Sequence, residues 1–170
     1  MEGSRRARSV GSERTLNVDV AARTEIAAYL RLSADAVAQR LRRSQRRARG
    51  VRIKLKTADF RVVTRQGVLN EPTDVAAVLF ARAAELLEEI SQPGPFRLVG
   101  LAAYDIDVDG SAAQLDLVPT AGRRERRLET AVDALVDRFG SGVVKRAGDL
   151  NRDRGVGVSA NLDFLHEPEE

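Results

Sequence analysis

Residues 50–60, GVRIKLKTADF, constrain the fold of this 170-residue chain more than any other segment. Apolar Val51, Ile53 and Leu55 alternate there with the basic side chains of residues 52, 54 and 56. Successive side chains of a β-strand point to opposite faces of a sheet, so the alternation predicts a strand with one buried face and one open face. A sheet covered on one side only is typical of antiparallel strands.

The segments around this strand supply the rest of a small domain. Residues 9–20 and 61–69 show strand-like patterns, and the second is expected to pair antiparallel with 50–60 after a turn at 58–59. Residues 96–106, FRLVGLAAYDI, predict a last strand. The sequence therefore predicts an α+β fold, a four-stranded and mainly antiparallel sheet with two helices on one face in the order β-α-β-β-α-β.

Two helices are expected between these strands. Ile26 and Leu30 share one helical face, and Ser33 is interpreted as the cap of a second helical segment that contains Val37 and Leu41. The next helix is expected to begin after Pro72-Thr73-Asp74 and to end before Pro93-Gly94-Pro95.

Outside the sheet domain at 9–107, the sequence predicts four further parts. They are a basic linker at 1–8, a linker at 108–127, an amphipathic helical extension at 128–150 and a poorly ordered tail at 151–170. The helix is expected to turn Leu128, Val132, Leu135, Val136 and Phe139 inward and to end near Gly140.

The composition limits the possible function classes. The chain has no cysteine, which excludes disulfides and thiolate metal sites, and no apolar run of transmembrane length. No signal-peptide core follows the Arg-rich N-terminus, so a cytoplasmic location is expected. Residues 1–66 carry 17 Lys and Arg against 6 Asp and Glu, whereas the remainder carries 11 against 19. This asymmetry favours a polyanion partner for the first part.

The basic side of the strand at 50–60 is the candidate site. Alternate residues of a strand lie about 6–7 Å apart, close to the spacing of phosphates along a nucleic-acid strand. Cations and small hydroxyls suit backbone contacts, which need no base-edge geometry. The predicted phosphate-contacting residues are Ser12, Arg14, Arg52, Lys54, Lys56, Thr64 and Arg65. These strands lack stacking aromatics, which favours a duplex over a single strand. An ordinary solvated sheet face, with Lys preventing edge pairing, is an equally good reading.

The ordered set SVGSERTL, VRIKLKTADFRVVTRQGVL, EPTD and FRLVGLAAYDI resembles the little-finger domain of Y-family translesion DNA polymerases, in the bacterial DNA polymerase IV group. The resemblance implies a four-stranded sheet whose open face grips the phosphates of double-stranded DNA, at the residues named above. It also implies that the two magnesium ions belong to a catalytic palm that this sequence lacks. We therefore expect no cofactor, no metal site and no enzymatic activity for this chain alone.

The segment DIDVDGSAAQLDLV, residues 105–118, allows two functional readings. Asp105, Asp107, Asp109 and Gly110 are spaced like the start of a calcium loop, but a strand precedes them and Pro119 interrupts the following segment, so the flanking helices of such a loop are missing. Residues Gln114, Leu115, Asp116, Leu117 and Val118 resemble the sliding-clamp-binding motif of bacterial polymerases, with Val118 in place of a larger side chain. Leu117 packing under the final helix is the alternative.

Two other function classes remain open at this point. The chain could be a protein-interaction module that docks on the sliding clamp or on other repair proteins, and a clamp pull-down distinguishes this function. An RNA-binding module of similar build is the third hypothesis, which a preference for single strands would favour.

Overall fold

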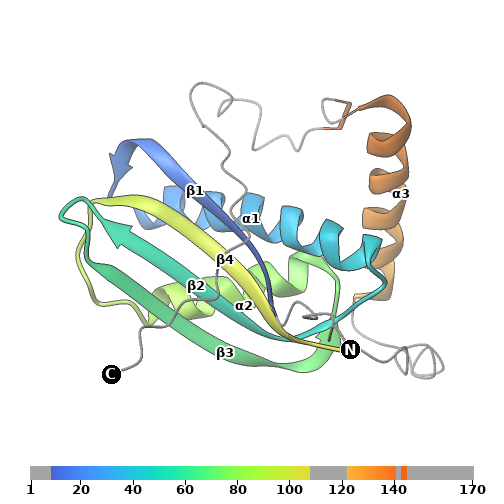
Figure 1. Cartoon of the computed structure of the whole chain (residues 1–170), viewed down its shortest axis with the longest axis horizontal. Helices are drawn as coiled ribbons and strands as arrows, with labels where there is room; N and C mark the ends of the chain where they lie inside the picture. Colours follow the sequence, from blue (N-terminus) through green and yellow to red (C-terminus); the bar gives the residue numbers. More distant parts are fainter. Residues whose placement is uncertain (1–8, 108–121, 141–142, 145–170) are drawn as a thin grey trace, which may run out of the picture.

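The computed structural model describes residues 9–107, 122–140 and 143–144. The elements follow one another as β1 (Ser9–Val20), α1 (Arg23–Arg43), β2 (Ala48–Thr57), β3 (Val62–Thr73), α2 (Ala76–Glu88), β4 (Phe96–Ile106) and α3 (Arg123–Phe139). The four strands form one sheet in the order β1-β4-β2-β3, and every neighbouring pair is antiparallel. Helices α1 and α2 lie on the same side of it (Figure 1). The predicted fold class is confirmed.

The core lies between the sheet and these two helices. The two faces predicted for β2 are confirmed. Val51, Ile53 and Leu55 are fully buried, and the basic residues that alternate with them are partly exposed. β4 lies between β1 and β2, and its Val99 and Leu101 are also fully buried. The helices contribute mainly aliphatic side chains to the same core, among them Leu30, Val37 and Leu41 from α1 and Leu79, Ala83 and Leu86 from α2.

Helix α1 is continuous, so the prediction that Ser33 caps a second segment is wrong. Ile26, Leu30, Val37 and Leu41 recur at three- and four-residue spacing and form one buried stripe. Ser33 lies within this stripe and is fully buried. Its hydroxyl has no hydrogen-bond partner among the described residues. The continuous apolar stripe outweighs the local capping signal, because tertiary packing supplies most of the stability of a helix.

Helix α2 begins close to the predicted start. The backbone N–H of Val75 donates to the Thr73 hydroxyl at 3.1 Å, and the N–H of Ala76 donates to the carboxylate of Glu129 at 2.9 Å. The second bond comes from α3, which therefore satisfies a donor at the start of α2 that would otherwise lack a helical partner.

Helix α3 begins at Arg123, earlier than the predicted start at 128, and stands at the C-terminal end of α1 (Figure 1). It packs through its acidic side: Asp133 accepts from Nε of Arg42 at 2.6 Å, Glu129 also binds Arg42, and Asp137 binds Arg43. The prediction that its apolar residues point inward is wrong for Leu128, Leu135 and Phe139, which are exposed, whereas Val132 and Val136 are partly buried. Ion pairs, rather than the apolar stripe, orient this helix.

Among the described residues, no helix has both the length and the apolar character required to cross a membrane.

Candidate nucleic-acid interface

The sheet surface opposite α1 and α2, called the open face below, is set by the register of the strands. Arg52, Lys54 and Lys56 project from β2 on this face, because the residues between them are buried on the other. Residues directly opposite in an antiparallel pair lie on the same face. Gln66, Thr64 and Val62 of β3 therefore join them, and so do Ala102, Gly100 and Leu98 of β4. The structure brings four predicted residues together: Arg52, Lys54, Lys56 and Thr64.

The other three predicted residues lie on the helix-covered side of the sheet. Ser12 is opposite Leu101 and only 5% exposed, and Arg14 is opposite Val99. Arg65 is opposite the buried Ile53. These residues do not belong to the open face, and their placement there is corrected. A shift of one residue in the phase of a strand moves every side chain to the other face, and the polar pattern of β1 and β3 left that phase ambiguous.

The same register adds residues that sequence reasoning missed. Glu13 and Thr15 of β1 lie opposite Gly100 and Leu98 and so belong to the open face. Gln66 lies opposite Arg52, and Tyr104 of β4 lies opposite Gly50. The register that pairs Arg52 with Gln66 and Lys54 with Thr64 comes from the structure, since the turn predicted at 58–59 would instead have put Arg65 opposite Arg52. The sequence did not fix the phase of β1 either.

Lys54, at the centre of the basic row, is paired with an acid. Its Nζ lies 3.0 Å from Oε1 of Glu13, and both side chains are largely shielded from solvent. Glu13 reaches Lys54 across β4 at Gly100, where a Cβ atom would lie 2.7 Å from the Glu13 Cγ. A side chain at position 100 would therefore obstruct this path. The ion pair lowers the net positive charge that the open face presents at its centre.

Arg52 is held in place by two uncharged neighbours, Gln66 and Tyr104. Its Nε donates to Oε1 of Gln66 at 2.9 Å, and its guanidinium carbon lies 5.8 Å from the centre of the Tyr104 ring. That ring covers Gly50, where a Cβ would come within 2.2 Å of Tyr104 Cζ. Tyr104 packs flat on the sheet beside Arg52. A bidentate donor fixed in this way is suited to a phosphate oxygen.

A third cationic position lies at the β2–β3 turn. Nζ of Lys56 and the guanidinium carbon of Arg97 both lie 4.7 Å from the centre of the Phe60 ring, which is exposed. Asp59 accepts hydrogen bonds from the Thr57 hydroxyl and from Arg61. The Thr57 bond, followed by the Arg61 guanidinium, lowers the pKa of Asp59 below its usual value. The turn thus places two cations against one exposed aromatic ring.

A sequence model of a known family matches most of the chain. Residues 7–117 match the sequence model of the family described as impB/mucB/samB family C-terminal domain. The chain belongs to this family.

Relatives of this impB/mucB/samB-family chain are bacterial DNA polymerases. The chain is 36% identical to DNA polymerase IV 1 of Mesorhizobium japonicum over 148 residues, which cover 87% of the chain and 34% of the relative. It is 32% identical to DNA polymerase IV of Brucella melitensis over 161 residues, which cover 95% of the chain and 36% of the relative. The chain therefore spans about a third of the length of these curated relatives.

Solved structures agree with the family assignment. The little finger domain of PolIV, solved in a complex with the beta-clamp processivity factor, is 28% identical with a TM-score of 0.50, and the match covers 59% of this chain and 91% of that chain. An insertion ternary complex of Dbh DNA polymerase matches with a TM-score of 0.52 and 13% identity, over 61% of this chain and 30% of that chain, and shows the shared fold. The predicted resemblance to a Y-family little finger of the DNA polymerase IV group is confirmed.

Three predicted features lie wholly outside the described residues. They are the basic linker at 1–8, the clamp-like residues Gln114 to Val118 and the tail at 151–170. At the start of the calcium-like segment, Asp107 accepts from Nε of Arg49 at 3.2 Å and from Nη2 at 3.3 Å. Asp105 adopts a positive φ of 51° at the end of β4. The described part of this segment therefore belongs to β4 as far as Ile106, and Asp107 directly after the strand pairs with Arg49.

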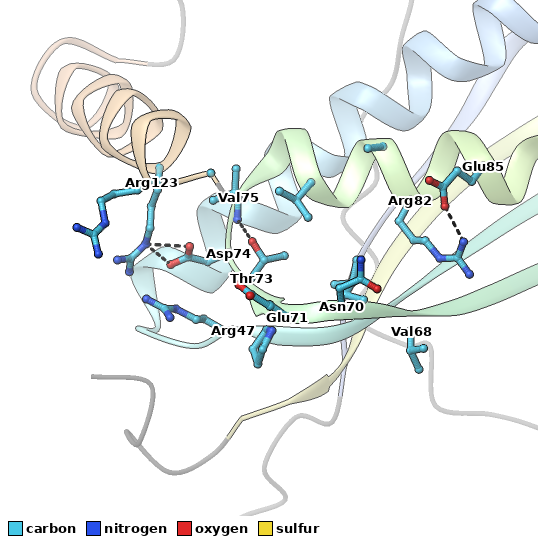
Figure 2. Close-up of a pocket in the computed structure, with 16 residues that line it drawn as sticks. Arg47, Val68, Asn70, Glu71, Thr73, Asp74, Val75, Arg82, Glu85 and Arg123 are labelled. Carbon is cyan, nitrogen blue, oxygen red and sulfur yellow. Dashed lines mark hydrogen bonds and ion pairs between the residues drawn. The ribbon is translucent and has the colours of Figure 1, made fainter. Parts of the chain in front are cut away.

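A cavity of about 620 Å³ lies between the end of β3, the start of α2 and the start of α3 (Figure 2). Val68, Val75 and Val78 line it together with charged side chains. Two ion pairs close its walls: Arg126 to the buried Asp74 at 2.9 Å, and Arg82 to Glu85 at 2.7 Å. Within the described ranges, no group of three or more His, Cys, Asp or Glu side chains is placed to hold a metal ion.

Proposed function

We propose that this chain binds the phosphate backbone of duplex DNA without regard to sequence, as the little-finger part of a translesion DNA polymerase. The observation that supports this most directly is the row of Arg52, Lys54 and Lys56 on the sheet face that none of the described helices covers (Figure 1). Contacts of this kind neutralise phosphates and release counterions, so binding weakens as salt rises. Thr64 and Gln66 beside the row add neutral donors for phosphate oxygens.

The ion pair between Glu13 and Lys54 refines which cations contribute. Arg52 and Lys56 contact neutral partners, Gln66 and the Phe60 ring, and retain their full charge toward an anion. Lys54 shares its charge with Glu13 at 3.0 Å. We assign the largest contributions to Arg52 and Lys56, with Lys54 contributing less.

Catalysis is assigned to a part of the polymerase outside this chain. Phosphoryl transfer needs carboxylate-held metal ions that neutralise the developing charge. In the resembled family these groups belong to the palm, and the chain matches the family's C-terminal domain. For the isolated chain we still predict no enzymatic activity, no cofactor and no metal site. Its cytoplasmic location also stays a prediction.

The test is a binding titration with a primer–template duplex at several salt concentrations. Replacing Arg52 and Lys56 with Ala should weaken binding on every sequence alike and reduce the salt slope by about 1 for each cation removed. Arg65→Ala is the matched control, since it removes the same charge from the neighbouring strand but on the helix-covered face. Equal losses in the double variant and in Arg65→Ala would contradict the assignment to the open face.

A second function, docking on the bacterial sliding clamp, has one specific observation in its favour. The PolIV little finger that is 28% identical to this chain was solved in a complex with its beta-clamp. The motif resemblance at Gln114 to Val118 points to the same partner, with Leu115 and Leu117 as apolar anchors. A clamp pull-down with Gln114→Ala and Leu115→Ala tests it, and undiminished capture would remove this segment from the mechanism.

A further inference from the structure

The described ion pairs of helix α3 with helix α1 all come from its acidic side. Glu129, Asp133 and Asp137 follow one another at four-residue spacing and face the end of α1. Arg42 binds the first two, Arg43 binds the third, and Gln39 donates to Asp133 at 3.4 Å. Burial would lower the pKa of Arg42, but the hydrogen bond and charge of Asp133, with Glu129 and Asp74, raise it above its usual value. These contacts fix the rotation of the helix about its own axis.

This rotation turns an apolar stripe toward solvent. Leu128 is 66% exposed, Leu135 44% and Phe139 59%, and Val132 lies between them on the same side. The spacing of these residues is four, three and four, the pattern with which one helix packs along another. The stripe is about 16 Å long, at 1.5 Å for each residue. Contiguous exposed apolar residues on a folded domain mark an interaction surface.

Basic residues border the stripe on its outer side. Arg124, Arg127 and Arg138 are exposed and lie in one row along the helix, with Ala131 and Ala134 between them. The guanidinium carbon of Arg138 lies 5.2 Å from the centre of the Phe139 ring. The two small alanines leave room for a neighbouring backbone beside the stripe.

The geometry points to this outer face of α3 as a docking site for an amphipathic helix of a partner protein, whose apolar residues are flanked by Asp and Glu. The stripe supplies the apolar anchors, and the arginine row supplies charge complementarity, which favours acidic flanks and disfavours basic ones. A second copy of α3 would bring a like arginine row, and phosphates would gain nothing from Leu128 and Leu135. The site is separate from the open face of the sheet.

The experiment uses the full chain and two synthetic helical peptides of about 21 residues, three heptads with Leu at a and d. One carries Glu at e and g, which keeps it from pairing with itself, and the other carries Lys there. Binding is measured by fluorescence anisotropy for the parent, for Leu128→Ser with Leu135→Ser, and for Arg124→Glu with Arg127→Glu. Val18→Ser is the matched control, since Val18 is an exposed aliphatic residue of β1.

We expect the Glu peptide to bind the parent and Val18→Ser alike, and to bind both α3 double variants at least tenfold more weakly. The Lys peptide should not bind. Because the altered residues are exposed, the melting temperature should not change, which separates lost docking from unfolding. The proposal is overturned if both peptides bind equally or if the Leu128→Ser, Leu135→Ser variant binds like the parent.

Two further measurements test whether a membrane or a second copy of the chain occupies the stripe instead. Phosphatidylglycerol vesicles test a membrane surface, and sedimentation velocity over a range of concentrations tests self-association. The proposal is also overturned if the Glu peptide does not bind while the parent binds vesicles or forms dimers, and the Leu128→Ser, Leu135→Ser variant does not. Vesicle binding would then assign the stripe to lipid, and dimer formation would assign it to a second copy of the chain.

Discussion

Glu13 and Lys54 form an ion pair across the middle of the sheet, with 3.0 Å between Oε1 and Nζ. The two residues belong to β1 and β2, which are not neighbours, and β4 lies between them. Gly100 makes the contact possible, because any side chain there would meet Glu13. The pair thus sets the charge of the open face at its centre, and this face is the proposed site of DNA binding.

Glu13→Gln should therefore strengthen DNA binding. Gln removes the negative charge while keeping the length of the side chain, so Lys54 becomes available to a phosphate. The affinity for a duplex should rise several-fold at moderate salt, and the plot of log K against log salt should steepen by about 0.9. Anisotropy titrations between low and moderate salt provide both quantities.

The control for this prediction is a double-mutant cycle. In a Lys54→Ala background, Glu13→Gln removes only general repulsion, so its effect on the salt slope should be smaller. The same change in slope in both backgrounds would mean that the ion pair does not limit the contact of Lys54 with DNA.

Gly50→Ala should destabilise the domain. A Cβ atom at this position would lie 2.2 Å from Cζ of Tyr104, whose ring packs flat over the glycine. Overpacking of this kind costs about 1–3 kcal/mol in the free energy of unfolding. Urea unfolding measures the loss. In a Tyr104→Ala background the obstruction is gone, so Gly50→Ala should cost little there, and an unchanged cost would assign the effect to the backbone instead of the ring.

Much of the fold could be predicted because its signals are local. The alternation around Ile53 identifies β2, and Pro72 on one side with Pro93 and Pro95 on the other bracket α2, so element types and order follow from the sequence. The sheet order could not be derived this way, since nothing local in FRLVGLAAYDI says that β4 lies between β1 and β2. The strand and helix patterns predicted the fold class, the family resemblance agreed with it, and the structure supplied the register.

The candidate site was predicted in part for the same reason. Arg52, Lys54 and Lys56 alternate with large aliphatic residues, which fix their face. Ser12 and Arg14 lie in a strand with few large apolar residues, so either phase was compatible with the sequence. The predicted orientation of α3 was wrong for a different reason. Its apolar stripe predicts an inward face, but Arg42 and Arg43 on α1 bind the acidic side of the helix. The four-residue spacing of Glu129, Asp133 and Asp137 is visible in the sequence, but it does not identify Arg42 and Arg43 as their partners.

Ser33→Ala should stabilise the domain. The Ser33 hydroxyl is fully buried in α1 and has no hydrogen-bond partner among the described residues. Removing an unsatisfied buried polar group, and gaining the higher helix propensity of Ala, should raise the free energy of unfolding by about 1 kcal/mol. Thermal and urea unfolding check this, and a fall in stability would show that the hydroxyl does have a partner in solution.

Arg42→Met should release α3 from the domain while the sheet and the first two helices stay folded. The Arg42 side chain is 9% exposed and binds both Glu129 and Asp133, so its loss leaves two shielded carboxylates without their main partner. Removing one partner of a buried ion pair costs about 3–5 kcal/mol. Hydrogen exchange should show lost protection in α3 amides and retained protection in β2 and β4.

Arg43→Met is the matched control for Arg42→Met. The side chains of Arg43 and its partner Asp137 are both more than half exposed, and such pairs contribute about 0–1 kcal/mol. Equal loss of α3 protection in the two variants would show that burial of the Arg42 pair does not hold the helix in place.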